Sequence, residues 1–374
     1  MTPSRILIIK PSSLGDVATT LPMLCNLRRA YPAAKIDWLI HPSLTALVEG
    51  HDAINELIPF DRKRLAAWWY KPAALALFRQ LLSRLRSAHY DLVLDAQGLF
   101  RSGFFARYTR AKTRIGFATA REGATLFYTH NVPLENGGKK MIAVDRMRAL
   151  LAPLNIDTKR PAEFRLPIDP AARDRAAQLL PPTARFAAII PGARWDTKRW
   201  SIEGFTEIAR RLPSLGLTPL LLGSPDEKPL CDAIVSSVQL PVSRSEVPSV
   251  APTGNWPLDT GHSSDTGHFP LNLAGLTSLA EMIALLARCS LVIGNDSGPL
   301  HVAVALGRPC VAIYGPTDPA YVGPYGQLEN VVRFAVDCHP CRRKTCDHHS
   351  CMRGVTVEAV WQKTQQLSRT PTQA

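Results

Sequence analysis

The sequence predicts an α/β protein built from two Rossmann-like domains, each with a parallel sheet. Short apolar runs rich in β-branched residues alternate with segments of helical periodicity, which is typical of parallel strands connected by helices. The chain has 374 residues, more than one ordinary domain uses, and its strand-first pattern starts again after a stretch rich in proline and alanine. We therefore expect domains of residues 1–165 and 166–374 that face each other across a cleft.

The expected strands follow one another with helical segments between them. The chain begins with an apolar run at 5–10, and the segment at 17–32 has apolar residues at helical spacing and ends at a proline. Residues 243–268 are polar and aperiodic, which predicts a disordered insertion that carries no chemistry. Further strands are expected at 35–40, 90–95, 185–190, 218–223, 290–294 and 310–315.

Basic residues are concentrated in the first half of the chain. The net charge is +13, and residues 1–160 contain 24 Lys and Arg against 12 Asp and Glu. Nucleic acid, an anionic membrane surface or an acidic substrate would each explain this excess, and a solvated basic face remains an alternative. No apolar run reaches the roughly 18 residues of a membrane span, and the first residues lack the features of a signal peptide. We therefore expect a cytoplasmic protein.

A carboxylate stands in the loop after the first expected strand, in the segment "KPSSLGDVATT". Ligands of open parallel sheets lie at the carboxyl ends of the strands, so this loop is a candidate site. Ser12 and Ser13 offer hydroxyl and N–H groups to an anion, and Gly15 permits a tight turn. A helix expected to begin near Val17 adds the positive end of its dipole. Asp16 either takes part in the chemistry or caps that helix, and this segment alone leaves both readings open.

The second domain supplies a matching loop in the segment "GNDSGPLHVAVALGRP", which follows an expected strand and starts a helix. Backbone N–H groups around Ser297 and Gly298 are expected to point toward a diphosphate. Asp296 precedes them, and His301 follows on the first helical turn. We expect His301 to contact the ligand, although a polar core residue would give the same pattern.

Cations and another carboxylate follow two further strands. The segment "PGARWDTKRWS" carries Arg194, Lys198 and Arg199, which could neutralise a diphosphate leaving group. In "LLGSPDEK", Glu227 lies just past a strand end, where a carboxylate can accept hydrogen bonds from ribose hydroxyls. A carboxylate that complements the dipole of the following helix is the alternative.

Several segments together resemble the family 9 glycosyltransferases, which include the lipopolysaccharide heptosyltransferases. The order is "RILIIKPSSLGDV", "DAQGLFRSG", "GFATAREGA", "PGARWDTKRW", "GSPDE", "NDSGPLH" and "YGPTDP", and it spans nearly the whole chain apart from 243–268. The resemblance implies a GT-B fold and an inverting, metal-independent transfer of a heptose or related sugar. The implied donor is a nucleotide-diphosphate sugar, ADP-heptose above all. The implied acceptor is the acidic inner core of lipopolysaccharide, reached from the cytoplasmic face of the inner membrane.

The resemblance also implies roles for individual residues. Asp16 stands where the family has its proposed general base, Lys198 would contact phosphate and Glu227 the ribose. On the acceptor side it points to Ser13, Gln97, Arg101 and Arg121, and also to Lys139 or Lys140. The implied donor-binding set is Ser13, Gly15, Lys198, Glu227, Asp296, Ser297, Gly298 and His301.

The cysteines fall into two groups. Four of them, in the segment "CHPCRRKTCDHHSC", have a spacing that suits a tetrahedral structural zinc, and free thiols are the alternative because a reducing cytoplasm disfavours disulfides. These four are Cys338, Cys341, Cys346 and Cys351. The scattered Cys25, Cys231, Cys289 and Cys310 are expected to be buried as small apolar groups.

Two rival functions come from other classes. A sugar-nucleotide epimerase with a GT-B-like fold would change its donor without needing an acceptor. A module that only binds nucleic acid or zinc would need an exposed surface of basic and aromatic residues. The ordered segments disfavour both, so we expect no nucleic-acid partner and no catalytic cofactor.

Overall fold

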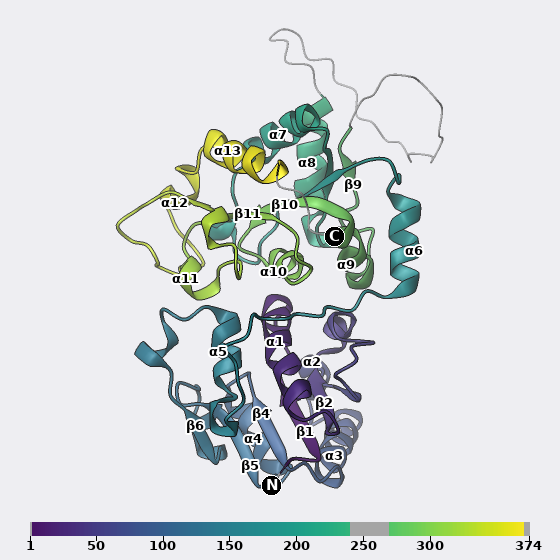
Figure 1. Cartoon of the computed structure of the whole chain (residues 1–374), viewed down its shortest axis with the longest axis vertical. Coiled ribbons are helices and arrows are strands. Elements are labelled where there is room, and N and C mark those ends of the chain that lie inside the picture. Colours follow the sequence, from purple (N-terminus) through teal and green to yellow (C-terminus); the bar gives the residue numbers. More distant parts are fainter. Residues whose placement is uncertain (1, 240–268, 370–374) are drawn as a thin grey trace.

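The computed structural model describes residues 2–239 and 269–369, which form two α/β domains (Figure 1). Each domain has a six-stranded sheet in which every pair of neighbouring strands runs parallel. The strand order is β3-β2-β1-β4-β5-β6 in the first sheet and β12-β11-β10-β7-β8-β9 in the second. The predicted fold class is therefore confirmed. The insertion predicted at 243–268 lies outside the described residues.

Helices cover both faces of the first sheet because its central strand is apolar on both sides. Ile6 and Ile8 belong to the core cluster that includes α1, whereas Leu7 and Ile9 pack with α3 and α4 on the opposite face. The strands are β1 (Arg5–Ile9), β2 (Lys35–Ile40), β3 (Glu56–Pro59), β4 (Leu92–Asp95), β5 (Thr113–Phe117) and β6 (His130–Val132). The helices are α1 (Leu14–Ala30), α2 (Arg62–Leu65), α3 (Pro72–Ser87), α4 (Phe100–Tyr108) and α5 (Ala143–Ala149).

The second sheet is built in the same way. Ile189 and Ile293 pack toward α7, α8 and α13, whereas Ile190 and Val292 join the cluster that contains α6, α9 and α10. The strands are β7 (Phe186–Ile190), β8 (Thr218–Leu221), β9 (Leu271–Asn272), β10 (Cys289–Asn295), β11 (Cys310–Tyr314) and β12 (Val331–Arg333). The helices are α6 (Pro170–Leu179), α7 (Ile202–Arg211), α8 (Lys228–Gln239), α9 (Leu279–Arg288), α10 (Gly298–Ala305), α11 (Pro319–Val322), α12 (Ser350–Arg353) and α13 (Val357–Ser368).

The first helix begins earlier than the sequence predicts. Ser13 is its N-cap and Leu14 is already helical, so α1 starts three residues before the expected Val17. The helix ends at Ala30 because the residue before Pro32 is disfavoured in the helical region. The loop that carries Asp16 is therefore the first turn of α1 itself.

The two domains meet through α1 and α10, whose side chains belong to one continuous apolar cluster. Figure 1 shows α10 directly above the N-terminal end of α1. The chain crosses from one domain to the other between β6 and β7. The predicted boundary at 165/166 lies on this crossing and stays a prediction. No helix within residues 2–239 and 269–369 is long and apolar enough to cross a bilayer.

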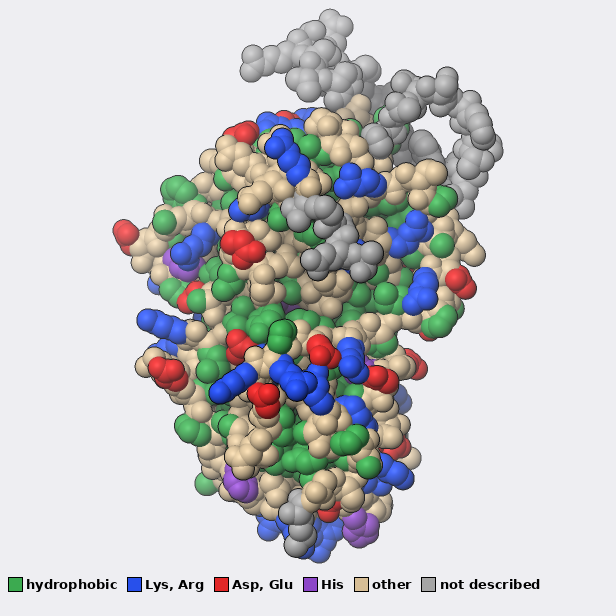
Figure 2. Space-filling model, in the orientation of Figure 1, with side chains coloured by type: hydrophobic (Ala, Val, Ile, Leu, Met, Phe, Trp, Pro, Cys, Tyr) green, Lys and Arg blue, Asp and Glu red, His purple; other side chains and the backbone are tan. Residues whose placement is uncertain are grey.

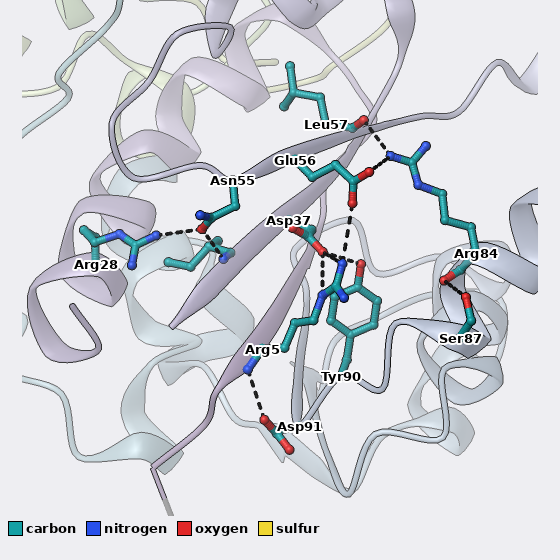
Figure 3. Close-up of polar contacts among 11 residues, drawn as sticks. Arg5, Arg28, Asp37, Asn55, Glu56, Leu57, Arg84, Ser87, Tyr90 and Asp91 are labelled. Atoms are coloured by element: carbon teal, nitrogen blue, oxygen red, sulfur yellow. Dashed lines mark hydrogen bonds and ion pairs between the residues drawn. The ribbon is translucent and has the colours of Figure 1, made fainter. Parts of the chain in front are cut away.

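A partly buried ion pair stabilises the end of the first sheet that points away from the second domain. The Arg5 guanidinium donates from Nε and Nη2 to Asp37 Oδ2 at 3.0 and 2.9 Å, and the Tyr90 hydroxyl donates to the same oxygen at 2.8 Å (Figure 3). Burial and the neighbouring Asp37 carboxylate raise the pKa of Tyr90, which therefore stays a donor. These contacts join β1 to β2 and support the strand that carries the site loop.

Candidate functional site

A cavity of about 930 Å³ lies between the domains, at the carboxyl ends of the strands of both sheets. Its walls include the loops after β1, β7, β8, β10 and β11. The structure thus brings the predicted base and the whole predicted donor-binding set to one cavity. These lining residues are Ser13, Gly15, Asp16, Lys198, Glu227, Asp296, Ser297, Gly298 and His301.

Asp16 is held in a defined position without losing its access to the cavity. Its Oδ2 accepts hydrogen bonds from Ser13 N at 3.0 Å and Ser13 Oγ at 2.7 Å, while Oδ1 lies 3.9 Å from Lys10 Nζ. Half of the side chain, 51%, is exposed to solvent. Burial in the cleft raises the pKa of Asp16, but Lys10, the Ser13 hydrogen bonds and His301 outweigh it, so the pKa is lowered. The carboxylate is therefore ionised at neutral pH and both caps α1 and faces the cavity.

The first turns of α1 and α10 touch across the cleft. A methyl group on Gly15 would lie 2.8 Å from Cδ2 of His301, and one on Gly298 would lie 2.8 Å from Cδ2 of Leu14. Only residues without a Cβ allow the two helix N-termini to approach this closely. The N-terminus of α1, with Asp16, therefore faces that of α10, whose free N–H groups favour an anion.

Asp296 organises the second-domain side of the cavity. Its Oδ2 accepts hydrogen bonds from Lys198 Nζ and from Thr317 Oγ1, each at 2.6 Å, and its Oδ1 lies 3.8 Å from Nε2 of His301. Burial raises the pKa of Asp296, but His301 and Lys198 outweigh burial and lower it to about 2. The ammonium of Lys198 also lies 4.8 Å from the ring centroid of Trp195. Lys198 is thereby fixed beside α10, where it can meet a phosphate.

Ser297 has a hydroxyl with no protein partner. It is the N-cap of α10, lines the cavity, and its Oγ is buried without a hydrogen bond within the described residues. A buried hydroxyl without a partner is uncommon and points to a ligand that completes it. The oxygen of a bound phosphate would do so, together with the N–H groups of the first turn.

Glu227 lies at the far end of the cavity, after β8. Its Oε2 accepts hydrogen bonds from Ser224 N at 2.8 Å and Ser224 Oγ at 3.0 Å, so Glu227 caps the turn that leads into α8. Cavity-lining residues from Thr277 to Leu279 lie at the same end of the sheet, after β9. The ribose contact implied for Glu227 stays a prediction that this position permits.

Apart from Ser13, the predicted acceptor residues are not part of the cavity wall. Asp95, fully buried at the end of β4, accepts hydrogen bonds from Gln97 N and Gly98 N at 2.9 and 3.0 Å, and Arg121 N donates to Gly98 O at 2.9 Å. Gln97 and Arg121 are thus joined through one loop, and Gln97 Oε1 is buried without a partner within the described residues. Arg101 lies exposed on the first turn of α4. Lys139 and Lys140 are exposed and also lie outside the cavity wall.

Comparison with known proteins decides the family. The model of "Glycosyltransferase family 9 (heptosyltransferase)" matches residues 78–243 and 262–351, more than half of the chain. The chain belongs to glycosyltransferase family 9. It is therefore a glycosyltransferase with the GT-B fold, and this membership supports neither the epimerase nor the binding-module alternative.

Individual family 9 relatives cover nearly all of the chain. Lipopolysaccharide heptosyltransferase 1 of Pseudomonas aeruginosa is 29% identical over 352 residues, 92% of this chain and 88% of the relative. The solved Escherichia coli heptosyltransferase WaaC with ADP has a TM-score of 0.74 and 25% identity, covering 97% of this chain and 99% of that one. A family 9 structure from Veillonella parvula has a TM-score of 0.77 at 22% identity, covering 98% and 97%, and shows the same fold.

Some residues in and around the cavity were not foreseen from the sequence. Lys10 and Thr317, which contact the predicted carboxylates, each follow a strand end, and that position was a usable signal. Arg146, Tyr321 and Arg342 gather at one end of the cleft from three separate segments. No spacing in the sequence connects those three, because they meet only when the domains pack.

The four cysteines of the predicted zinc site lie within residues 338–351. Among the described residues, no group of three or more His, Cys, Asp or Glu side chains could hold a metal ion. Cys351 is buried and Cys338 is exposed, and all four thiols are free. The zinc site stays a prediction, and elemental analysis of the purified protein would test it. The predicted burial of Cys25, Cys231, Cys289 and Cys310 is confirmed.

Proposed function

We propose that the protein transfers heptose from ADP-heptose to the inner core of lipopolysaccharide, with inversion and without a divalent metal. The names of the relatives support the sugar and the acceptor. The observation that carries the proposal is the pairing across one cavity of an ionised, accessible Asp16 with an anion site of Lys198, Ser297 and the α10 N-terminus. A base and a diphosphate site on opposite walls are what an inverting displacement requires.

In this mechanism, Asp16 accepts the proton of an acceptor hydroxyl while that oxygen attacks the anomeric carbon of the donor. The new C–O bond forms on the face opposite the diphosphate, and the bond between the anomeric carbon and the phosphate oxygen breaks. The electron pair leaves with the diphosphate, whose developing charge is stabilised by Lys198 and by the N–H groups of α10. These cationic groups do the work that a metal ion does in other transferases.

A panel of donors and acceptors tests the proposal. ADP-heptose, the matching UDP-sugar and no donor are each incubated with a heptose-free inner-core acceptor, and products are read by mass. We expect the mass of one heptose to be added only with ADP-heptose and acceptor together. Conversion of the donor without acceptor would indicate an epimerase, and transfer from UDP-sugars alone would contradict the donor.

We further propose that the first domain contacts an anionic membrane surface on the cytoplasmic side. The face seen in Figure 2 mixes acidic and basic side chains around the domain junction, so the net charge is not concentrated there. In contrast, three consecutive aromatic residues between α2 and α3, Trp68, Trp69 and Tyr70, are 45%, 74% and 57% exposed. Basic residues flank them, and aromatic and basic side chains together favour the bilayer interface. These are Arg62, Lys63, Arg64 and Lys71.

A further inference from the structure

The Cys-rich segment, residues 338–351, is docked against the loop that carries Lys198. Thr197 Oγ1 donates a hydrogen bond to Arg343 O at 2.8 Å, and the His349 ring nitrogen Nε2 lies 2.8 Å from Thr197 O. Thr197 is thus held through both its side chain and its backbone, next to the lysine that binds Asp296. The segment therefore supports the wall of the active site.

A second set of contacts joins the same segment to the loop after β11. His339 Nε2 lies 3.0 Å from Thr317 O, and Arg342 N donates to Pro316 O at 2.9 Å. Thr317 is the residue whose hydroxyl donates to Asp296. Anchoring on both sides places the side chain of Arg342 on the cavity wall.

Arg342 shares an aromatic ring with a cation from the other domain. Its guanidinium carbon lies 4.4 Å from the ring centroid of Tyr321, and that of Arg146, from α5, lies 3.5 Å from the same centroid. Arg146 also donates hydrogen bonds to the backbone oxygens of Met141 and Tyr321. Two positive charges from the two domains therefore lie close together at one corner of the cleft.

No carboxylate forms a direct ion pair with either of these two charges. Within the described residues, neither Arg146 nor Arg342 forms an ion pair with Asp or Glu. Burial lowers the pKa of Arg146 and outweighs Tyr321 and Asp16, which raise it, while the charge of Arg342 lowers it further. Like charges this close repel each other, so a bound anion would be stabilised here. Guanidinium groups suit carboxylate and phosphate oxygens, which they bind through two hydrogen bonds.

The order of the strands indicates whether the corner formed by Arg146 and Arg342 lies toward the nucleoside of the donor or beyond its diphosphate. Along the edge of the second sheet, Glu227 follows β8, Lys198 follows β7, Asp296 follows β10 and Tyr321 follows β11. Arg342 therefore lies at the end opposite Glu227. With ribose at Glu227 and diphosphate at Lys198, the corner of Arg342 lies beyond the phosphates, away from the nucleoside.

We propose that Arg342 binds an anionic group, a carboxylate or phosphate, of the acceptor, and that the Cys-rich segment is the acceptor-side wall of the cleft. This inference rests on the proposed transfer reaction. Arg146, buried below the same ring, supports the corner from the first domain and keeps it positive. The role assigned to the Cys-rich segment needs no metal, since its contacts are hydrogen bonds from Thr197, His339 and His349.

Steady-state kinetics of Arg342→Gln test the proposal. We expect the KM for a heptose-free inner-core acceptor to rise about tenfold or more, the loss of one charge-assisted contact, with the KM for ADP-heptose within twofold of wild type. Arg343→Gln is the matched control. It removes the same charge at the neighbouring position, where the side chain lies outside the cavity wall. Arg342→Lys should recover part of the acceptor affinity, because the charge returns without the planar fork.

Two results would overturn the proposal. An unchanged acceptor KM in Arg342→Gln would show that the guanidinium does not contact the acceptor. A rise confined to the donor KM would place the contact on the diphosphate. Titrating the acceptor against the ADP-bound protein measures the same contact without turnover. Wild-type protein that binds acceptor through Arg342 yet transfers no heptose would contradict the proposed reaction and leave this contact standing.

Discussion

The imidazole of His301, on the first turn of α10, lies against the backbone of Gly15, on the first turn of α1. A methyl group on Gly15 would meet Cδ2 of that ring at 2.8 Å and Cγ at 3.4 Å. His301 in turn lies 3.8 Å from Asp296 and lowers the pKa of Asp16. The base and the anion site are thus brought together by a helix contact that depends on the missing side chain at position 15.

Gly15→Ala is expected to reduce transfer by roughly 10- to 100-fold. Overpacking of this kind costs ~1–3 kcal/mol, and the strain falls on the spacing between Asp16 and the α10 N-terminus. Turnover with saturating substrates measures it, and thermal unfolding checks that the fold persists.

Gly50→Ala is the control for that variant. A methyl group there meets no atom within 4 Å, but the backbone has φ +77°, which disfavours alanine. Gly50→Ala should lower the melting temperature without lowering turnover. Equal turnover in Gly15→Ala and wild type would contradict the importance of the helix contact.

The ionised carboxylate of Asp296 should stabilise the folded protein at neutral pH, and this stabilisation should be lost at low pH. Its pKa in the folded protein is about 2, below the value near 3.8 of an unperturbed carboxyl, so the folded state prefers the ionised form. Its contribution, about 2 kcal/mol, is present above pH ~4 and is lost as the pH falls toward 2. Urea unfolding of wild type and Asp296→Asn should therefore differ clearly at pH 7 and much less at pH 2.5. A difference that is the same at both pH values would contradict the pKa assignment.

Trp69→Ser should weaken binding to vesicles that contain anionic lipid. Trp69 is 74% exposed beside a run of basic residues, so its loss removes apolar contact with the bilayer interface while the protein core is untouched. Co-sedimentation with vesicles of phosphatidylglycerol and phosphatidylethanolamine measures binding. Phe334→Ser, at a 47% exposed aromatic residue after β12, is the matched control and should bind as wild type does. Equal binding by both variants would exclude the aromatic segment as the contact.

The strands foreseen from the sequence are those buried on both faces. β1, β2, β4, β7, β8, β10 and β11 are central or long and consist of near-continuous apolar residues. The strands β3, β5, β6, β9 and β12 were not expected. β6 and β9 have three and two residues, too few to show a pattern, and β12 is partly exposed at the sheet edge.

The residues of the site also fall into a group that could be predicted from the sequence and a group that could not. The donor-side residues could be predicted because each stands in a loop just after a strand, as Lys198 and Asp296 do. Arg342 could not, because its place on the cavity wall follows from the hydrogen bonds of the Cys-rich segment to Thr197 and Thr317. The roles of Gln97 and Arg121 come from the family resemblance, and the structure holds them together outside the cavity.

The central claim is that Asp16 is the base of the transfer reaction, and Asp16→Asn tests it most directly. The amide keeps the size and can still accept the Ser13 hydrogen bonds, so α1 remains capped. Glu281→Gln is the matched control, because Glu281 caps α9 through Ser278 in the same way but lies outside the cavity wall. We predict that kcat of Asp16→Asn falls by ~10²–10⁴-fold while ADP affinity stays within twofold and Glu281→Gln keeps wild-type turnover. Turnover of Asp16→Asn within a few-fold of wild type would contradict the account.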